Sequence, residues 1–146
     1  MSIRYVHTAA APEPAGHYSQ ATVHQGVVYV SGMLPLDPVT RAVVPGGMEE
    51  QLVRTLENIR AVLEAAGSDF AHALRLTVYI PDISLWGAVN ATYARVMGDA
   101  RPARAVIPSM LPTLWGLFST VRPSPANTPS PSPTWVSVPP WPRPSS

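Results

Sequence analysis

The strongest constraint on the fold is a strand pattern that lies between two helix patterns. Residues 48–67 place large aliphatic side chains at offsets of 4, 7 and 11, at Leu52, Leu56, Ile59 and Leu63. This spacing puts one apolar stripe along a helix, and Gly67 is a residue type that commonly ends helices. We therefore expect an amphipathic helix that buries this stripe.

The next segment alternates with the two-residue period of a strand. Its apolar positions are Leu74, Leu76, Val78 and Ile80, which we expect to form one buried face, and Pro81 ends the run. A second helix is expected over residues 85–98, with Ser84 as its N-cap. We expect its inward face to carry Trp86, Asn90, Tyr93 and Met97, with Trp86 and Met97 in the core. If Asn90 is buried, its side chain needs a hydrogen-bond partner.

Further β-rich runs flank these elements. Residues 21–35 predict a hairpin whose turn is His24-Gln25-Gly26, where glycine supplies a positive φ. Residues 103–108 and 114–121 predict two more strands. Strands that alternate with amphipathic helices indicate an α+β domain in which two helices cover one face of a sheet. We expect a partner subunit to cover the other face.

Composition argues against several chemistries. The chain has no cysteine, its ten basic residues are all arginine, and its four histidines (His7, His17, His24 and His72) show no metal-ligand spacing. We therefore expect no disulfide, no thiolate or lysine Schiff-base chemistry, and no metal. The chain also lacks both an apolar run of about 20 residues and a signal-peptide pattern. This predicts a cytoplasmic protein without a membrane partner.

Charge is distributed unevenly along the chain. Residues 1–100 hold six arginines and nine acids, a net charge of −3, whereas residues 101–146 hold four arginines and no acid, a net charge of +4. Four arginines over that length are too sparse to follow a phosphate backbone, so we expect no nucleic-acid partner. Residues 122–146 hold nine of the eighteen prolines and predict a disordered, Pro/Ser-rich tail.

Arg104 stands where the chain leaves the second predicted helix and enters an apolar strand. A guanidinium cannot lose its charge, so burying it is costly unless an anion meets it. Considered alone, Arg104 fits a structural ion pair better than a ligand-binding role. Its partner is therefore either a carboxylate of the chain or a carboxylate of a substrate.

Five motifs, in this order, resemble the RidA (YjgF) group of enamine/imine deaminases. They are Gly-His-Tyr-Ser-Gln-Ala at 16–21, Val-Tyr-Val-Ser-Gly-Met-Leu-Pro-Leu-Asp-Pro-Val-Thr at 28–40, the helical runs at 55–68 and 89–97, and Arg-Pro-Ala-Arg-Ala-Val at 101–106. The resemblance covers about residues 7–106, and we expect the domain to extend over residues 1–121. Together, the five motifs in this order are far more specific than any one of them.

The resemblance implies a RidA/chorismate-mutase-like fold, with one mixed sheet of about six strands, two helices on one face and a homotrimer with clefts between subunits. It implies hydrolysis of 2-imino acids to 2-keto acids and ammonia, without a cofactor or metal. By position, Arg104 matches the catalytic arginine that binds the substrate carboxylate. Tyr18, Ser31, Gly32 and Asn90 match further residues of the substrate cleft.

Two positions depart from the family pattern. Val106 stands where a small polar residue or cysteine is usual, and about Thr120 stands where the last strand carries a glutamate near the reacting water. Two functions therefore stay open: a Rid-type deaminase, or a non-catalytic member of the same fold that binds small carboxylates or another protein. Because acids disappear where proline and serine become frequent, we hypothesise a frameshift near residues 117–120, which makes residues 122–146 its product.

Overall fold

The computed structural model describes residues 2–109 and 117–121 of the chain. The predicted tail at 122–146 lies outside the described residues. The described elements are β1 (Arg4–Val6), β2 (Ala21–His24), β3 (Val27–Met33), α1 (Met48–Ala66), η1 (Phe70–His72), β4 (Ala73–Ile80), η2 (Ile83–Leu85), α2 (Trp86–Met97), β5 (Ala103–Pro108) and β6 (Leu117–Val121). The elements η1 and η2 are single 3₁₀ turns.

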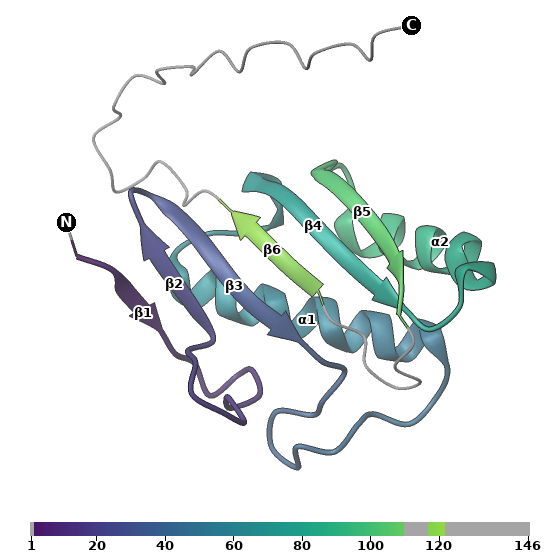
Figure 1. Ribbon diagram of the computed structural model, residues 1–146, viewed down its shortest axis with the longest axis horizontal. Coiled ribbons are helices and arrows are strands. Elements are labelled where there is room, and N and C mark those ends of the chain that lie inside the picture. The colour runs from purple at the N-terminus through teal and green to yellow at the C-terminus, as the bar shows by residue number, and fades with distance from the viewer. Residues whose placement is uncertain (1, 110–116, 122–146) are drawn as a thin grey trace, which may run out of the picture.

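The strands form one six-stranded sheet in the order β1-β2-β3-β6-β4-β5. Strands β4 and β5 are parallel, and every other neighbouring pair is antiparallel. Helices α1 and α2 pack on each other and lie on the same face of the sheet, behind the strands in Figure 1. The predicted α+β architecture with two helices is therefore confirmed.

The hydrophobic core lies between the sheet and the two helices. Strand residues that point toward the helices are buried, among them Val28, Val30, Leu76, Val78 and Ile80. The predicted stripe of α1 meets them, since Leu52, Leu56, Ile59 and Leu63 are all fully buried. Burial of a side chain of this size stabilises the fold by about 1.5–3 kcal/mol, so this stripe fixes α1 on the sheet.

The ends of α1 follow from local chemistry. The Glu50 carboxylate accepts a hydrogen bond of 2.8 Å from the Gly47 N–H, and Glu49 and Glu50 place negative charge at the positive end of the helix dipole. Gly67 ends the helix at φ 85°, in the left-handed region that favours glycine, and its N–H bonds to the Glu64 carbonyl at 3.0 Å. The predicted stop at Gly67 is confirmed.

The turn between β2 and β3 contains only two residues. Gln25 and Gly26 have φ values of 49° and 75°, the combination that fits a tight hairpin with the right-handed strand twist. His24 does not belong to the turn, because it pairs with Val27 in the ladder. The hairpin was predicted, but its turn is one residue shorter than the sequence pattern indicated.

Three local expectations are wrong. Leu74 is 51% exposed, because the ladder between β4 and β6 shifts by one residue between Ala73 and Arg75. Such a β-bulge leaves a residue unpaired and breaks the alternation of faces. Trp86 is 47% exposed, since it is the first residue of α2 and the buried stripe begins only at Val89. Ser84 is not an N-cap: it lies inside η2, where its N–H donates to the Asp82 carboxylate at 2.8 Å.

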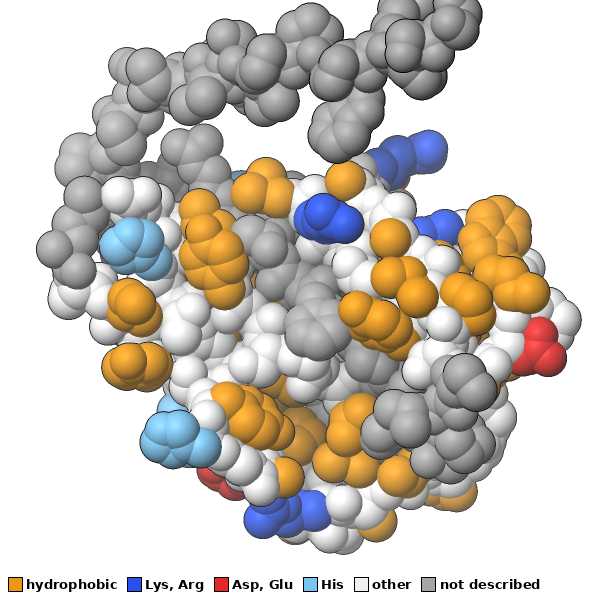
Figure 2. Space-filling model, in the orientation of Figure 1, with side chains coloured by type: hydrophobic (Ala, Val, Ile, Leu, Met, Phe, Trp, Pro, Cys, Tyr) orange, Lys and Arg blue, Asp and Glu red, His pale blue; other side chains and the backbone are white. Residues whose placement is uncertain are grey.

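The helix-free face of the sheet carries exposed apolar side chains. Tyr5 and Tyr29 share this face, since both pair with Thr22 in the ladder, and they are 71% and 48% exposed. Ile107 of β5 is also exposed. Figure 2 looks onto this face and shows hydrophobic side chains spread across it. None of the described helices is long and apolar enough to cross a membrane.

Candidate functional site

Arg104 lies on β5, at the edge of the sheet, where its guanidinium reaches α2. Strand β5 runs parallel to β4, and Arg104 pairs with Leu76, whose side chain points toward the helices. The Arg104 Nη2 group donates a hydrogen bond of 2.9 Å to the Asn90 Oδ1 atom. The Arg104 Cζ atom lies 4.6 Å from the centre of the Tyr93 ring. The predicted pair of Arg104 and Asn90 is therefore brought together.

Asn90 and Tyr93 lie three residues apart on α2, a spacing that places two side chains on the same helix face. Tyr93 is buried, and its hydroxyl has no hydrogen-bond partner among the described residues. Burial raises the pKa of Tyr93 above its usual 10.0, an effect that the nearby Arg104 cation partly opposes. The ring thus stays neutral at ordinary pH and presents its electron-rich face to the guanidinium.

An open groove of about 420 Å³ lies between α2, the following loop and the start of β5. The groove is lined by Asn90, Tyr93, Ala94, Met97, Gly98, Ala100, Arg101, Pro102 and Arg104. No carboxylate lines it, and Arg104 forms no ion pair with any described residue. The half-buried Arg104 guanidinium is thus contacted by a neutral amide and an aromatic ring. Neither group neutralises its charge, so the cation and its other N–H donors are available to an anionic ligand.

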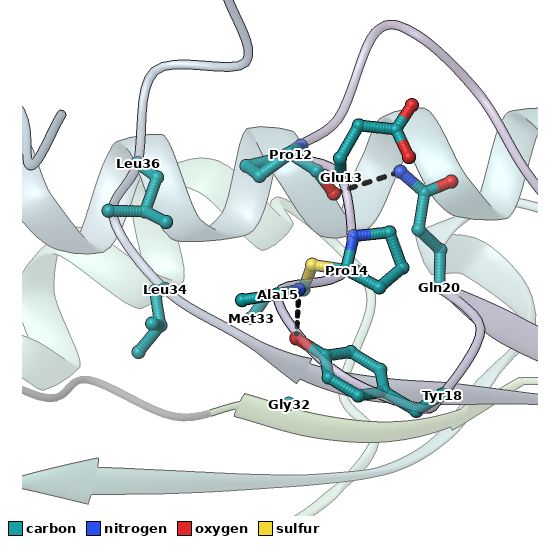
Figure 3. Close-up of a pocket in the computed structure, with 10 residues that line it drawn as sticks. All are labelled: Pro12, Glu13, Pro14, Ala15, Tyr18, Gln20, Gly32, Met33, Leu34 and Leu36. Atoms are coloured by element: carbon teal, nitrogen blue, oxygen red, sulfur yellow. Dashed lines mark hydrogen bonds between the residues drawn. The ribbon is translucent and has the colours of Figure 1, made fainter. Parts of the chain in front are cut away.

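Tyr18 lies in a second, smaller pocket near the end of β3 (Figure 3). This pocket holds about 60 Å³ and includes Gly32 in its wall. The Tyr18 hydroxyl accepts a hydrogen bond of 3.2 Å from the Ala15 N–H, a contact within the loop that carries both residues. Leu34 and Leu36 also line this pocket, and their carbonyls accept hydrogen bonds of 3.0 and 2.9 Å from the buried Asn58 amide of α1.

Ser31 and Gly32 lie where β3 is irregular. The ladder between β3 and β6 shifts by one residue between Val30 and Met33. The Ser31 hydroxyl donates to the Ser19 carbonyl at 2.6 Å, and the Ser31 N–H donates to the Gln20 carbonyl at 2.9 Å. Bulges of this kind occur often beside binding sites, because they release backbone groups from the ladder.

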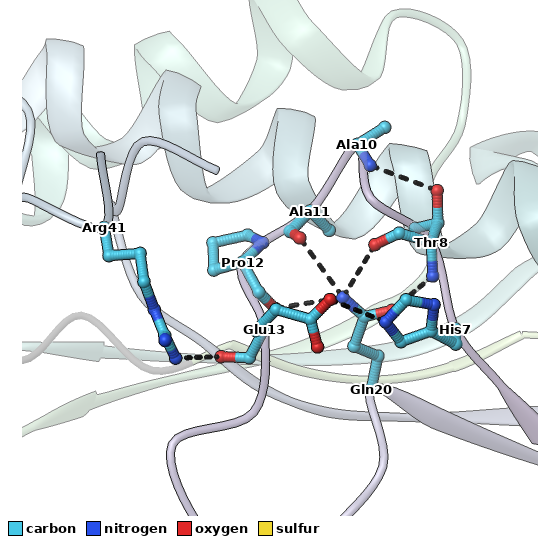
Figure 4. Close-up of polar contacts among 8 residues, drawn as sticks. All are labelled: His7, Thr8, Ala10, Ala11, Pro12, Glu13, Gln20 and Arg41. Atoms are coloured by element: carbon cyan, nitrogen blue, oxygen red, sulfur yellow. Dashed lines mark hydrogen bonds and ion pairs between the residues drawn. The ribbon is translucent and has the colours of Figure 1, made fainter. Parts of the chain in front are cut away.

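Gln20 fixes the loop that carries Tyr18, a role that sequence reasoning missed. Its side chain is 1% exposed. The Gln20 Nε2 group donates to the carbonyls of Thr8, Ala11 and Pro12 at 3.0, 3.2 and 3.0 Å, and its Oε1 atom accepts from the Thr8 N–H at 2.7 Å (Figure 4). The sequence shows Gln20 as a polar residue directly before a strand. Its hydrogen-bond partners could not be predicted, because they lie in an irregular loop without a sequence pattern.

Within one chain, the two groups of predicted residues are separate. Tyr18, Ser31 and Gly32 gather beside β3, whereas Asn90 and Arg104 gather beside β5. Strands β6 and β4 lie between β3 and β5. At a spacing of about 4.8 Å between neighbouring strands, β3 and β5 are roughly 14 Å apart. Tyr18 and Arg104 of one chain also line different pockets that share no residue.

The two positions that depart from the family pattern lie at different places in the sheet. Val106 pairs with Val78 and packs against the core. Thr120 pairs with Tyr29 of β3 and with Arg75 of β4, in the middle of the sheet. Val106 therefore serves packing, while the place expected for a glutamate lies on a central strand.

Comparisons with known proteins identify the family to which the fold described above belongs. Residues 8–111 match the family described as Endoribonuclease L-PSP, so the chain belongs to this family, the RidA (YjgF) group. The chain is 41% identical over 102 residues to 2-iminobutanoate/2-iminopropanoate deaminase of Capra hircus, covering 70% of this chain and 74% of the relative. It is 39% identical over 107 residues to a RutC family protein of Pyrococcus abyssi, covering 73% and 84%.

The fold is also shared with solved structures. A protein of unknown function of the conserved Rid protein family from Yersinia pestis superposes with a TM-score of 0.78 at 30% identity. The match covers 83% of this chain and 99% of the solved chain. The prediction of the Rid family is confirmed, and the roles of individual site residues stay predictions.

Proposed function

We propose that this protein is a Rid-type deaminase that hydrolyses 2-imino acids to 2-keto acids and ammonia, with Arg104 binding the substrate carboxylate. The observation that carries the proposal is the half-buried Arg104 guanidinium, which the Asn90 amide and the Tyr93 ring hold in an open groove without a carboxylate partner among the described residues. The goat relative named as an imine deaminase supports the same chemistry.

The reaction asks little of the protein beyond placement and charge. Water adds to the carbon of the protonated imine, the carbon–nitrogen bond then breaks, and ammonia leaves with the 2-keto acid as the other product. Arg104 holds the carboxylate through two parallel N–H···O bonds, which fixes the plane of the adjacent imine carbon. We propose that no metal or cofactor takes part, and that the reaction runs in the cytoplasm.

The complete site is proposed to form between subunits of a homotrimer. Within one chain, β3, which carries Ser31 and Gly32, lies roughly 14 Å from β5, and Tyr18 lines a different pocket from Arg104. A neighbouring subunit that covers the helix-free face would bury Tyr5 and Tyr29 and could bring its own Tyr18 segment to this chain's Arg104. Asn90 then orients Arg104, and the backbone near Gly32 lines the cleft.

The second candidate is a non-catalytic member of the family that binds small carboxylates or another protein. The residue near position 120 favours it, because threonine cannot accept and return a proton to water as a glutamate can. Arg104 and its groove suit both candidates equally well. Only turnover separates them.

The test is hydrolysis of freshly generated 2-iminopropanoate and 2-iminobutanoate by the purified chain. A deaminase accelerates release of ammonia and the keto acid, and Arg104→Ala removes most of that acceleration. A folded protein that binds 2-oxobutanoate without accelerating the reaction supports the binder and contradicts the deaminase. An RNA substrate is the control for the family's endoribonuclease description, and we expect no cleavage. Light scattering gives the oligomeric state of the same sample.

A further inference from the structure

The groove beside β5 contains two arginines, and the proposed function uses only one. Arg101 lines the same groove as Arg104, three residues earlier in the chain. Arg101 is exposed, and it forms no hydrogen bond or ion pair with any other described residue. No residue in the described part of the chain therefore neutralises the charge of Arg101.

No neighbouring charge cancels this pair within the groove. The groove lining contains two guanidiniums, one amide and one phenol, and its other residues are glycine, proline, alanine and methionine. Asp99 lies between two lining residues but does not line the groove itself. A site with two fixed positive charges and no acid attracts dianions more strongly than monoanions.

We propose that Arg101 forms a second carboxylate subsite, so that the groove prefers 2-imino acids whose side chain carries its own carboxylate. This proposal rests on the proposed role of Arg104 in binding the carboxylate next to the imine. The two fork-shaped side chains then bind the two ends of one dicarboxylate, each through its planar N–H donors.

The spacing of the two arginines suits this substrate class. Three residues of chain span at most about 10 Å, and both side chains open on one groove. We therefore expect a ligand with two or three carbons between its carboxylates, such as 2-iminobutanedioate or 2-iminopentanedioate, to bridge the two guanidiniums. The volume of about 420 Å³ also leaves room beyond a three- or four-carbon acid, since pockets of roughly 300–1,000 Å³ hold much larger ligands.

The size of the preference follows from the exposure of Arg101. Arg104 is half-buried and held by two contacts. Arg101 is exposed, so its side chain loses conformational entropy when it binds a ligand. Exposed ion pairs contribute little, so the second carboxylate should improve binding by about two- to fivefold. The preference should shrink in high salt, because exposed charges are screened within about a Debye length.

The experiment compares ligands of equal carbon number that differ only in the second carboxylate. The stable 2-keto acids 2-oxopentanedioate and 2-oxopentanoate are measured by calorimetric binding, which reports on the site whether or not the protein turns over. The imines 2-iminobutanedioate and 2-iminobutanoate are then compared by kcat/KM. Arg101→Gln is the test variant. Arg95→Gln is the matched control, since Arg95 lies on α2 outside the groove and pairs with Glu49.

The expected result is a preference for the dicarboxylates in the parent and in Arg95→Gln, lost in Arg101→Gln and reduced by salt. Binding of the monocarboxylates should be nearly unchanged by Arg101→Gln. Equal affinity of the parent for both ligand types overturns the second subsite. So does a change of oligomeric state in Arg101→Gln with an unaltered preference, which would make Arg101 an interface residue. Absence of turnover together with a dicarboxylate preference in binding contradicts only the deaminase.

Discussion

Replacing Arg104 with alanine removes the cation that we propose holds the substrate carboxylate. Two charge-assisted hydrogen bonds are worth about 1.5–3 kcal/mol each. Arg104 is only half-buried, so the lower value applies to both bonds, about 3 kcal/mol in total. At 1.36 kcal/mol per tenfold change, kcat/KM for 2-iminobutanoate should fall roughly 150-fold.

The same substitution should leave the fold intact. Arg104 makes one hydrogen bond to Asn90 and one contact with the Tyr93 ring. A hydrogen bond contributes about 1 kcal/mol net, and a cation–π contact contributes about 0.5 kcal/mol when exposed and about 2 kcal/mol when desolvated. The free energy of unfolding should therefore drop by about 1.5–3 kcal/mol, which a domain of this size tolerates.

The assay measures imine hydrolysis and urea unfolding on the same preparations. Arg95→Ala is the matched control, because it removes an exposed guanidinium of α2 that pairs with Glu49 outside the groove. We expect its kcat/KM to equal that of the parent. Full activity of a folded Arg104→Ala would refute the carboxylate-binding role, and an unfolded Arg104→Ala would make Arg104 a structural residue.

Three further predictions concern other parts of the chain. Because burial raises the pKa of the Tyr93 hydroxyl above 10.0, its neutral form stabilises the fold fully below that pH, and stability is lost as pH rises through the folded-state pKa. Tyr93→Phe should therefore flatten the alkaline loss of unfolding free energy, and an equally steep loss in the variant argues against this cause. Gln20→Leu leaves three backbone carbonyls without their donor and should lower the unfolding free energy by about 2–4 kcal/mol in urea titration; an unchanged midpoint would show that the loop is held otherwise. Finally, the coding DNA near residues 117–120 should contain another frame that encodes a strand alternating valine or isoleucine with glutamate and then stops early. Without such a frame, the frameshift hypothesis fails.

Patterns repeated along the chain made most of the fold predictable. The stripe of α1 and the alternation in β4 each average over several residues, so a single misplaced side chain does not hide them. Gly67 and the Gln25-Gly26 turn could be anticipated, because few residue types accept a positive φ. Helices, strands and turns with a regular local pattern can thus be predicted without knowledge of the segments that pack against them.

What escaped prediction depends on contacts between distant segments. Leu74 is exposed because of its register against β6, which no local pattern records. The ring contact between Tyr93 and Arg104 was not foreseen, although Tyr93 was placed on the same helix face as Asn90, because it depends on how α2 crosses β5. The bonds of Gln20 involve backbone carbonyls of an irregular loop. Sequence patterns identified the candidate site, and only the packing supplied its geometry.

The central place of β6 has a consequence for how the protein is made. This strand is the last described element in the chain, yet it joins β3 to β4 and so connects the two halves of the sheet. During synthesis, the edges of β3 and β4 that pair with β6 stay unpaired until residues 117–121 leave the ribosome. Such edges pair readily with other chains. The nascent protein is therefore most prone to aggregate before residues 117–121 emerge, and errors in the coding stretch for these residues act on the middle of the sheet.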